Sequence, residues 1–151
     1  MATAYKIKEF TLDFKEILKQ YEEFQGTLKT YFVEKNLNQV FDSPNDPSAL
    51  FSIASYDFST HIRPYIFNGK MYGEVNFYEV YPNGECGKNL KRIFIGPSGR
   101  IYLAISTDGP FDLDIDVRNL EPDLQFSNGN PLLELILLPL ADDLFRLYTY
   151  E

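Results

Sequence analysis

Residues 62–117 consist of five apolar runs separated by short turn sequences, and this succession constrains the fold more than any other feature. Asn68-Gly69 separates the first two runs, and Asn-Gly between apolar runs is the strongest short-range signal for a hairpin. Because short turns join antiparallel neighbours, the pattern predicts an antiparallel meander. The predicted strands are Ile62–Phe67, Met71–Tyr81, Leu90–Ile95, Ile101–Ser106 and Phe111–Val117.

The first third of the chain shows helical periodicity instead. Apolar residues from Phe14 to Phe32 recur at steps of three and four, which predicts amphipathic helix. Asp13 and Glu16 have the spacing of a capping box, and Gly26 falls where it would divide the stretch into two helices. We therefore expect an α+β fold, with N-terminal helices packed on a mostly antiparallel meander sheet of five to six strands.

Length and composition favour a single globular domain over residues 1–151. The chain length is near the usual size of one domain, and 44% hydrophobic residues, with 13 Phe and 11 Tyr, suffice for a sizeable core. The residues predicted to form this core are Phe14, Ile17, Leu18, Phe24, Ile66, Val75, Phe77, Ile93, Ile95, Ile101, Leu103, Phe111 and Ile115.

Two segments are ambiguous. Phe51–Tyr56 follows a loop with two prolines and fits a short helix or an irregular stretch. Leu132–Leu138 is too continuously apolar to show a face, so a buried helical turn and a buried strand fit it equally well. Pro139 is expected to end either one, and the alternation in residues 145–149 fits a final strand.

No feature of the sequence predicts export or membrane insertion. Met1–Lys6 lacks the basic stretch and apolar run of a secretory signal. The longest apolar stretch, Leu132–Ala141, is interrupted by Glu134 and Pro139, whereas a membrane-spanning helix needs about 20 apolar residues. Cys86 is the only cysteine, so the chain forms no intramolecular disulfide. We expect a soluble, cytoplasmic protein.

The net charge comes from the last third of the chain. Residues 1–40 and residues 41–100 each hold six basic and six acidic residues, whereas residues 101–151 hold two basic and ten acidic ones. The difference of eight accounts for the whole net charge of −8. Because such a chain is repelled by anionic surfaces, we expect a basic protein partner and no binding to nucleic acid or membranes.

Residues 111–117 alternate strictly between apolar and acidic side chains, which in a strand places the aspartates on one face. Solvation of that face explains the pattern, and so does docking to Lys and Arg of a partner. The glycine and the last glutamate of an EF-hand loop are missing, which argues against calcium. The candidate binding residues, called the acidic face below, are Asp112, Asp114, Asp116, Glu121 and Asp123.

The sequence offers few catalytic candidates. His61 is the only histidine, and a lone histidine at the start of a strand is more often structural than catalytic. Cys86 lies in a glycine-containing loop near Lys88, but a catalytic thiolate normally needs a histidine base. Gly96–Arg100 lacks the spacing of a P-loop. We predict no catalytic residues, no cofactor, no metal site and no enzymatic activity.

Ile93–Leu103 and Asp108–Asp114 resemble the central hairpin region of the SUKH superfamily (SMI1/KNR4-like proteins). That region has an apolar-Ile-Gly turn, a strand, and a glycine-containing turn into a strand that ends in acidic residues. Helices before a sheet also match, whereas the family's tryptophans and double glycine are absent here. The resemblance implies an α+β fold and, in bacteria, often an immunity protein that neutralises a toxin by binding it.

Three functions are therefore considered. The leading hypothesis is a non-enzymatic acidic binding protein, an immunity or inhibitor protein that occludes a basic surface of a toxin or another protein. The second is a small-molecule-binding protein or enzyme with a pocket lined by the many Tyr and Phe side chains. The third is a structural subunit of a larger assembly.

Overall fold

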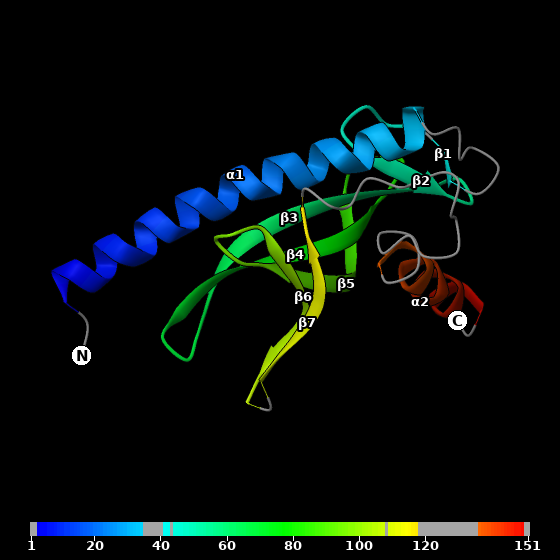
Figure 1. Ribbon diagram of the computed structural model, residues 1–151. Coiled ribbons are helices and arrows are strands. Elements are labelled where there is room, and N and C mark those ends of the chain that lie inside the picture. Colours follow the sequence, from blue (N-terminus) through cyan, green and yellow to red (C-terminus); the bar gives the residue numbers. More distant parts are fainter. Residues whose placement is uncertain (1–2, 35–40, 43, 108, 118–135, 150–151) are drawn as a thin grey trace.

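The structure of the chain is a computed structural model that describes residues 3–34, 41–42, 44–107, 109–117 and 136–149 (Figure 1). Within these residues a long N-terminal helix, α1, is followed by a seven-stranded sheet and a C-terminal helix, α2. The predicted α+β class is confirmed, with a helix packed on a meander sheet.

Helix α1 runs unbroken from Ala4 to Glu34 and lies across the sheet (Figure 1). It begins before the Asp13–Glu16 pair, and the hydroxyl of Thr3 caps it by accepting a hydrogen bond from the backbone N–H of Lys6 at 3.1 Å. The expected division at Gly26 is wrong. A mid-helix glycine costs about 0.5–1 kcal/mol, and the fully buried Phe24 and Leu28 hold the helix against the core on both sides of it.

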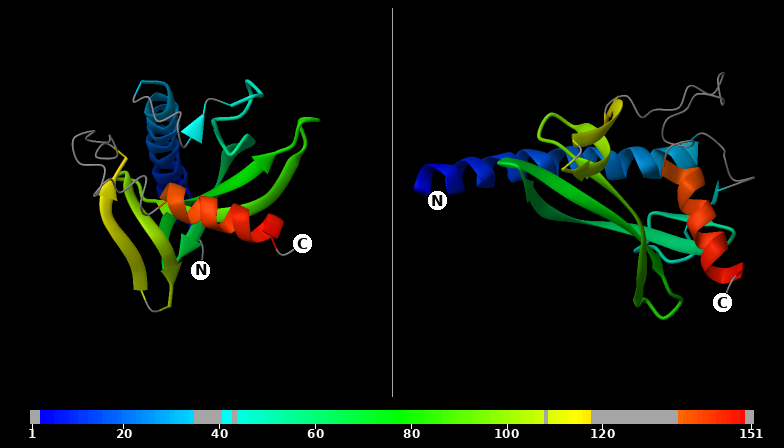
Figure 2. Two further views of the ribbon diagram at one scale, coloured as in Figure 1. Left: turned by 90° about the vertical axis from the view of Figure 1, so that its right-hand side faces the viewer. Right: turned by 90° about the horizontal axis from the view of Figure 1, so that it is seen from below.

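All seven strands pair antiparallel with their sequence neighbours, in the order β1 to β7. The sheet is twisted and curled, as the two views in Figure 2 show. Of the strands in the described residues, six have three residues or more, and β1 has two. The strands are β1 (Phe41–Asp42), β2 (Phe51–Ile53), β3 (Tyr56–Phe67), β4 (Lys70–Val80), β5 (Cys86–Ile95), β6 (Arg100–Ser106) and β7 (Gly109–Asp116).

One tight hairpin turn was predicted from the sequence, and a second one was not. Asn68 and Gly69 join β3 to β4 with φ values of 51° and 74°, as the Asn-Gly signal predicts. Ala54 and Ser55 join β2 to β3 with φ values of 49° and 69°. The helix or irregular stretch expected at Phe51–Tyr56 is therefore wrong, because these two residues adopt left-handed conformations that glycine and asparagine normally supply.

Residues 138–149 form a helix rather than a strand, whereas residues 132–135 of the ambiguous apolar run lie outside the described residues. Helix α2 runs from Leu138 to Thr149, so the final strand fitted to residues 145–149 is wrong. Pro139 was expected to end the preceding element but lies in the first turn of α2. Proline is tolerated there because the first N–H groups of a helix have no partner within the helix.

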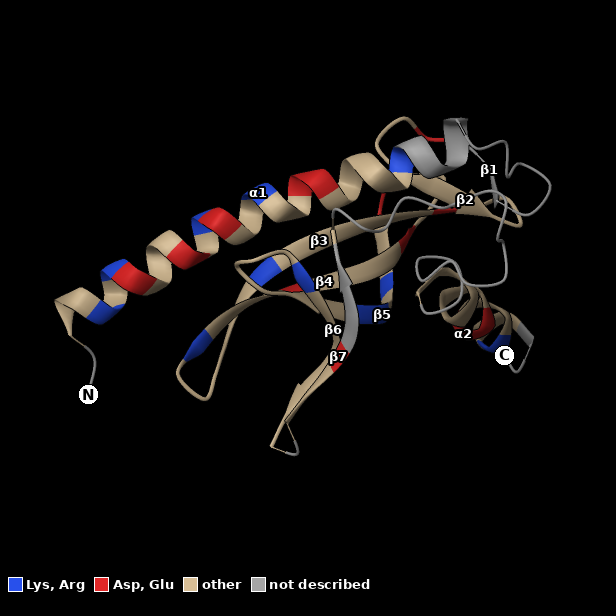
Figure 3. Cartoon of the chain, in the orientation of Figure 1, with Lys and Arg blue, Asp and Glu red and all other residues tan. Residues whose placement is uncertain are grey.

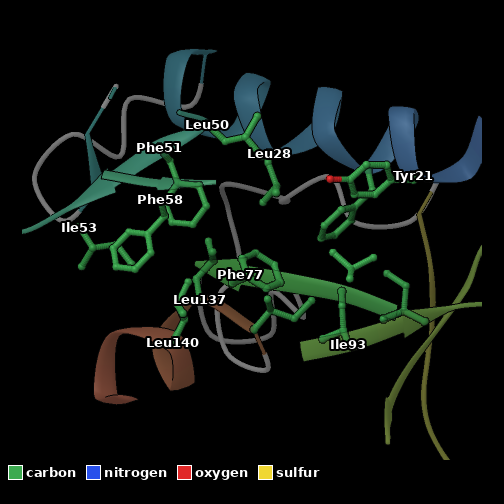
Figure 4. Close-up of a cluster of buried hydrophobic side chains, with 14 of the residues drawn as sticks. Tyr21, Leu28, Leu50, Phe51, Ile53, Phe58, Phe77, Ile93, Leu137 and Leu140 are labelled. Atoms are coloured by element: carbon green, nitrogen blue, oxygen red, sulfur yellow. The ribbon is translucent and has the colours of Figure 1, made fainter. Parts of the chain in front are cut away.

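One face of the sheet and both helices share the main core (Figure 4). Phe24 of α1 meets Phe77 of β4 edge to face at 6.3 Å between ring centroids, and Phe51 stacks on Phe58 at 5.6 Å. Leu140 of α2 belongs to the same core and lies on its side away from α1 (Figure 4). The predicted core residues found buried are Ile17, Phe24, Val75, Phe77, Ile93, Ile95 and Ile101.

Three predicted core residues are instead exposed to solvent: Leu18 by 38%, Ile66 by 55% and Phe111 by 60%. Phe14 and Leu103 are half-buried. The side chain of Ile115 lies outside the described residues. The described residues therefore leave Phe14 and Leu18, on the apolar stripe of α1, only partly covered.

The opposite face of the sheet carries no helix among the described elements. Ile93 and Ile95 point into the main core, so Phe94 between them lies on this second face, where it packs with Tyr72 and Ile105. Glu74, whose side chain is 2% exposed, lies on the same face. It accepts hydrogen bonds from Arg63 at 2.8 Å and Asn76 at 2.9 Å, and Arg92 is 3.6 Å away.

Candidate functional site

The predicted acidic face is only partly described. Asp112 is exposed on β7, and its carboxylate accepts a hydrogen bond from Nε of Arg100 at 2.6 Å. Asp114 and Asp116 are also in β7, but their side chains lie outside the described residues, as do Glu121 and Asp123 altogether. The acidic face therefore stays a prediction, and one of its charges already has a cationic partner in the chain.

The pairing of β7 with β6 is irregular between two of these aspartates. Asp112 pairs with Tyr102 and Asp116 with Arg100, and the ladder shifts register between them. A register shift interrupts the regular alternation of side chains along a strand. The strict alternation in the sequence therefore does not correspond to an uninterrupted ladder.

A second group of carboxylates lines an open pocket of about 500 Å³. The pocket lies where the start of β3, the end of β4 and a preceding loop come together, and Figure 3 colours acidic segments at this end of both strands red. We call it the acidic pocket. Its lining residues are Asn45, Asp46, Pro47, Ser55, Tyr56, Asp57, Glu79, Val80 and Pro82.

Asp57 holds the loop that forms one wall of the acidic pocket. Its Oδ1 accepts hydrogen bonds from the backbone and side-chain N–H groups of Asn45 at 2.9 and 3.2 Å, and its Oδ2 accepts one from the backbone of Asp46 at 2.9 Å. Asp46 in turn accepts hydrogen bonds from the backbone and hydroxyl of Ser48, which lower the pKa of its carboxyl. These bonds fix the wall of the pocket and keep Asp46 ionised.

Glu79 is the carboxylate of the pocket whose charge is least compensated. It is only 5% exposed, and the hydroxyl of Tyr148 donates to its Oε1 at 2.5 Å. Within the described parts of the chain no Lys, Arg or His forms a salt bridge with it. A buried carboxylate without a cation is costly, so this position favours a positively charged group supplied from outside.

Two tyrosines complete the electrostatics of the site. The rings of Tyr56 and Tyr148 stack with centroids 4.8 Å apart, beside Glu79. The hydrogen bond to Glu79, together with burial, raises the pKa of Tyr148, so this phenol stays neutral and keeps donating. Aromatic faces attract ammonium and guanidinium groups. The carboxylates and the ring of Tyr56 line the pocket, and Tyr148 contacts both Tyr56 and Glu79, so the site suits an organic cation.

Sequence reasoning did not single out this pocket because its residues come from segments far apart in the chain. One signal for it was present. Val75, Phe77 and Glu79 alternate along β4, so Glu79 occupies a position where the strand faces the core. Glu79 pairs with the fully buried Phe58 of β3. A carboxylate at such a position is unusual and marks a candidate site.

The single histidine and the single cysteine both lie beside Tyr78. The ring of His61 is 5.2 Å from that of Tyr78, and its Nε2 is 3.3 Å from the side-chain oxygen of Asn89. Burial raises the pKa of Tyr78, and the nearby thiol of Cys86, to which it is hydrogen-bonded, raises it further. Among the described contacts, none joins Cys86 to His61, so the structure contains no thiol–imidazole pair.

The described residues contain no group of three or more His, Cys, Asp or Glu side chains that could hold a metal ion. None of the described helices is long and apolar enough to cross a membrane. The chain matches no family model, and neither the curated proteins nor the solved structures include a significant match.

Proposed function

We propose that the chain is a non-enzymatic binding protein that recognises a basic protein surface, and that the acidic pocket receives a Lys or Arg side chain of that partner. One observation carries the proposal: Glu79 is a nearly buried carboxylate that has no salt bridge within the described residues and lies beside a stacked pair of tyrosines. A cation entering from a partner would supply the charge that Glu79 lacks.

The charge of the chain supports this proposal. With a net charge of −8, the protein attracts basic partners at long range, which speeds encounter and orients the complex. The pocket would fix the register of the complex. We propose an immunity or inhibitor role in the cytoplasm, in which the partner is a toxin whose basic substrate-binding surface is covered. This role also rests on the resemblance to the SUKH superfamily.

The experiment is affinity capture of a partner from the source cell, followed by binding measurements over a range of salt concentrations. Glu79→Gln removes one charge but keeps an acceptor for Tyr148, and Glu85→Gln removes one charge from an exposed loop position as the matched control. We expect Glu79→Gln to weaken binding about 10- to 100-fold and to flatten its salt dependence, because a charged pair across an interface is lost. Equal affinities for the two variants would contradict the role of the pocket.

The acidic face is tested separately with the triple variant Asp112→Asn, Asp114→Asn and Asp116→Asn. We expect a slower association rate and a weaker dependence on salt, because these aspartates would act mainly through long-range attraction. An unchanged affinity with an unchanged salt dependence would remove the acidic face from the proposed interface and leave the pocket as its centre.

The second candidate function is binding of a small organic cation by the same pocket. Its volume of about 500 Å³ and the Tyr56–Tyr148 stack favour this candidate. A thermal-shift screen of amines and neutral metabolites separates the two functions. A small amine that stabilises the protein and that Glu79→Gln fails to bind would favour the small-molecule function, whereas a captured basic protein would favour the first.

A further inference from the structure

An apolar groove of about 500 Å³ lies between the first half of α1 and the hairpin formed by β3 and β4. It is separate from the acidic pocket, which lies at the opposite end of β3. Its walls are almost entirely apolar, with Lys15 as the one charged residue of the lining. The lining residues are Ile7, Phe10, Thr11, Phe14, Lys15, Pro64, Ile66 and Met71.

The first half of α1 is poorly covered by the rest of the described chain. Ile17 is the first buried residue of the helix, whereas Ile7 is 61% and Leu12 is 54% exposed. Figure 1 shows this half of the helix reaching beyond the main body of the sheet. A helix segment of this length is marginal in water without tertiary packing, so a covering surface would stabilise it.

The exposed apolar side of α1 has the spacing of a helix–helix seam. Ile7, Thr11, Phe14 and Leu18 follow one another at steps of four, three and four residues, which is the heptad spacing of coiled coils. Phe14 and Leu18 were predicted to lie in the core, but this chain leaves them half-buried and exposed. The seam therefore suits a second helix.

The charges beside the seam indicate which helix fits. Lys8 and Glu22 are exposed, lie fourteen residues apart (22 − 8) and occupy the same heptad position. Neither forms a salt bridge with any described residue, whereas Lys6 pairs with Glu9 and Lys19 with Glu16. In an antiparallel pair of α1 helices that cross near Lys15, each Lys8 comes level with Glu22 of the other copy.

We propose that the apolar groove binds a second copy of this chain, with the two α1 helices packed antiparallel about a twofold axis near Lys15. The symmetry makes the contact self-complementary, so Lys8 pairs with Glu22 of the second copy at both ends. The seam residues of each helix, with Phe14 near the axis, fill the groove of the other copy. The two Lys15 side chains approach each other near the axis, and the proposal therefore includes one unfavourable like-charge contact.

Sedimentation equilibrium of the full-length protein tests this arrangement. We expect a dimer for the unaltered chain. The dissociation constant should rise about tenfold or more in either Lys8→Glu or Glu22→Lys, because each substitution places two like charges opposite each other at both ends of the contact. The double variant, Lys8→Glu with Glu22→Lys, should restore the original affinity. Lys19→Glu changes the charge of α1 away from the seam and should leave the dissociation constant unchanged.

A second variant tests the apolar part of the groove. Ile66→Asp places a charge on an exposed position of the hairpin wall, so the monomer should keep its circular dichroism spectrum while the dimer is lost. An unaltered chain that stays monomeric at about 1 mM would overturn the proposal. So would a dimer whose affinity the single charge reversals leave unchanged, or one that the double variant fails to restore.

Discussion

The hydroxyl of Tyr148 on α2 donates a hydrogen bond to the carboxylate of Glu79 on β4 at 2.5 Å, across 69 positions of the chain. This bond attaches the C-terminal helix to the sheet at the edge of the acidic pocket. It is also the only hydrogen bond that the carboxylate of Glu79 accepts from the described residues. The position of α2 and the electrostatics of the pocket are therefore linked through one pair of side chains.

The bond should contribute measurably to stability. Tyr148→Phe keeps the ring stacked on Tyr56 but removes the donor, so the nearly buried Glu79 loses its partner. We expect the free energy of unfolding to fall by about 1–3 kcal/mol, measured by urea denaturation at neutral pH. Tyr5→Phe is the matched control, because Tyr5 is 77% exposed. Equal losses in the two variants would contradict the contribution of the bond.

Glu74 should make the protein sensitive to acid. Burial alone would raise the pKa of its carboxyl, but hydrogen bonds from Asn76 and Arg63 and the charges of Arg63 and Arg92 outweigh burial and lower it below the ordinary 4.5. A lowered pKa in the folded state adds stability above the ordinary pKa, and this stability is lost as the pH falls through the folded-state value.

We therefore expect the unfolding free energy to fall as the pH drops below 4.5, and to fall less steeply in Glu74→Gln. Urea denaturation at a series of pH values measures both slopes. Glu85→Gln, at an exposed loop position, should keep the slope of the unaltered chain. A Glu74→Gln variant with the unaltered slope would show that this carboxylate does not titrate in the way described.

Gly73 should be required for the close approach of α1 to β4. A Cβ at this position would lie 2.6 Å from side-chain carbons of both Ile17 and Ile62, so Gly73→Ala requires these side chains, or the elements that carry them, to shift. We expect a loss of about 1–3 kcal/mol in unfolding free energy from overpacking. Gly26→Ala, at an open position in the middle of α1, should instead be neutral or stabilising. Thermal denaturation of the two variants distinguishes these opposite outcomes.

The turn between β2 and β3 should be improved by substitution. Ala54 and Ser55 both have positive φ values, which cost about 1–2 kcal/mol for each residue that carries a Cβ. Replacing Ser55 with Gly should therefore raise the melting temperature, whereas Ser106→Gly, at the exposed last residue of β6, should lower it. A lower melting temperature for Ser55→Gly would contradict the energetic cost assigned to the positive φ of Ser55.

The sequence predicted the sheet well because its turns carry explicit signals such as Asn68-Gly69. It failed at Ala54-Ser55, where contacts between β2 and β3 impose a turn that these residues do not favour themselves. It also failed at α2, where the alternation in residues 145–149 suggested a strand, although Leu140, Ala141 and Leu144 pack against the core at helical spacing.

The acidic pocket could not be predicted from the sequence for a similar physical reason. Glu79 and Tyr148 belong to elements whose proximity depends on the tertiary fold. Leu18 and Ile66 were predicted as core because periodicity reports that a face is apolar and does not report which molecule covers it. Their exposure beside the apolar groove led to the proposed contact with a second copy.

Binding of an organic cation in the acidic pocket can be measured directly. The measurement is an NMR titration with an arginine derivative blocked at both termini and, in parallel, with its uncharged citrulline analogue. We expect saturable shifts of the Tyr56 and Tyr148 ring signals with the arginine derivative alone, and no shifts in Glu79→Gln. Equal shifts with both ligands, or with both proteins, would contradict this expectation.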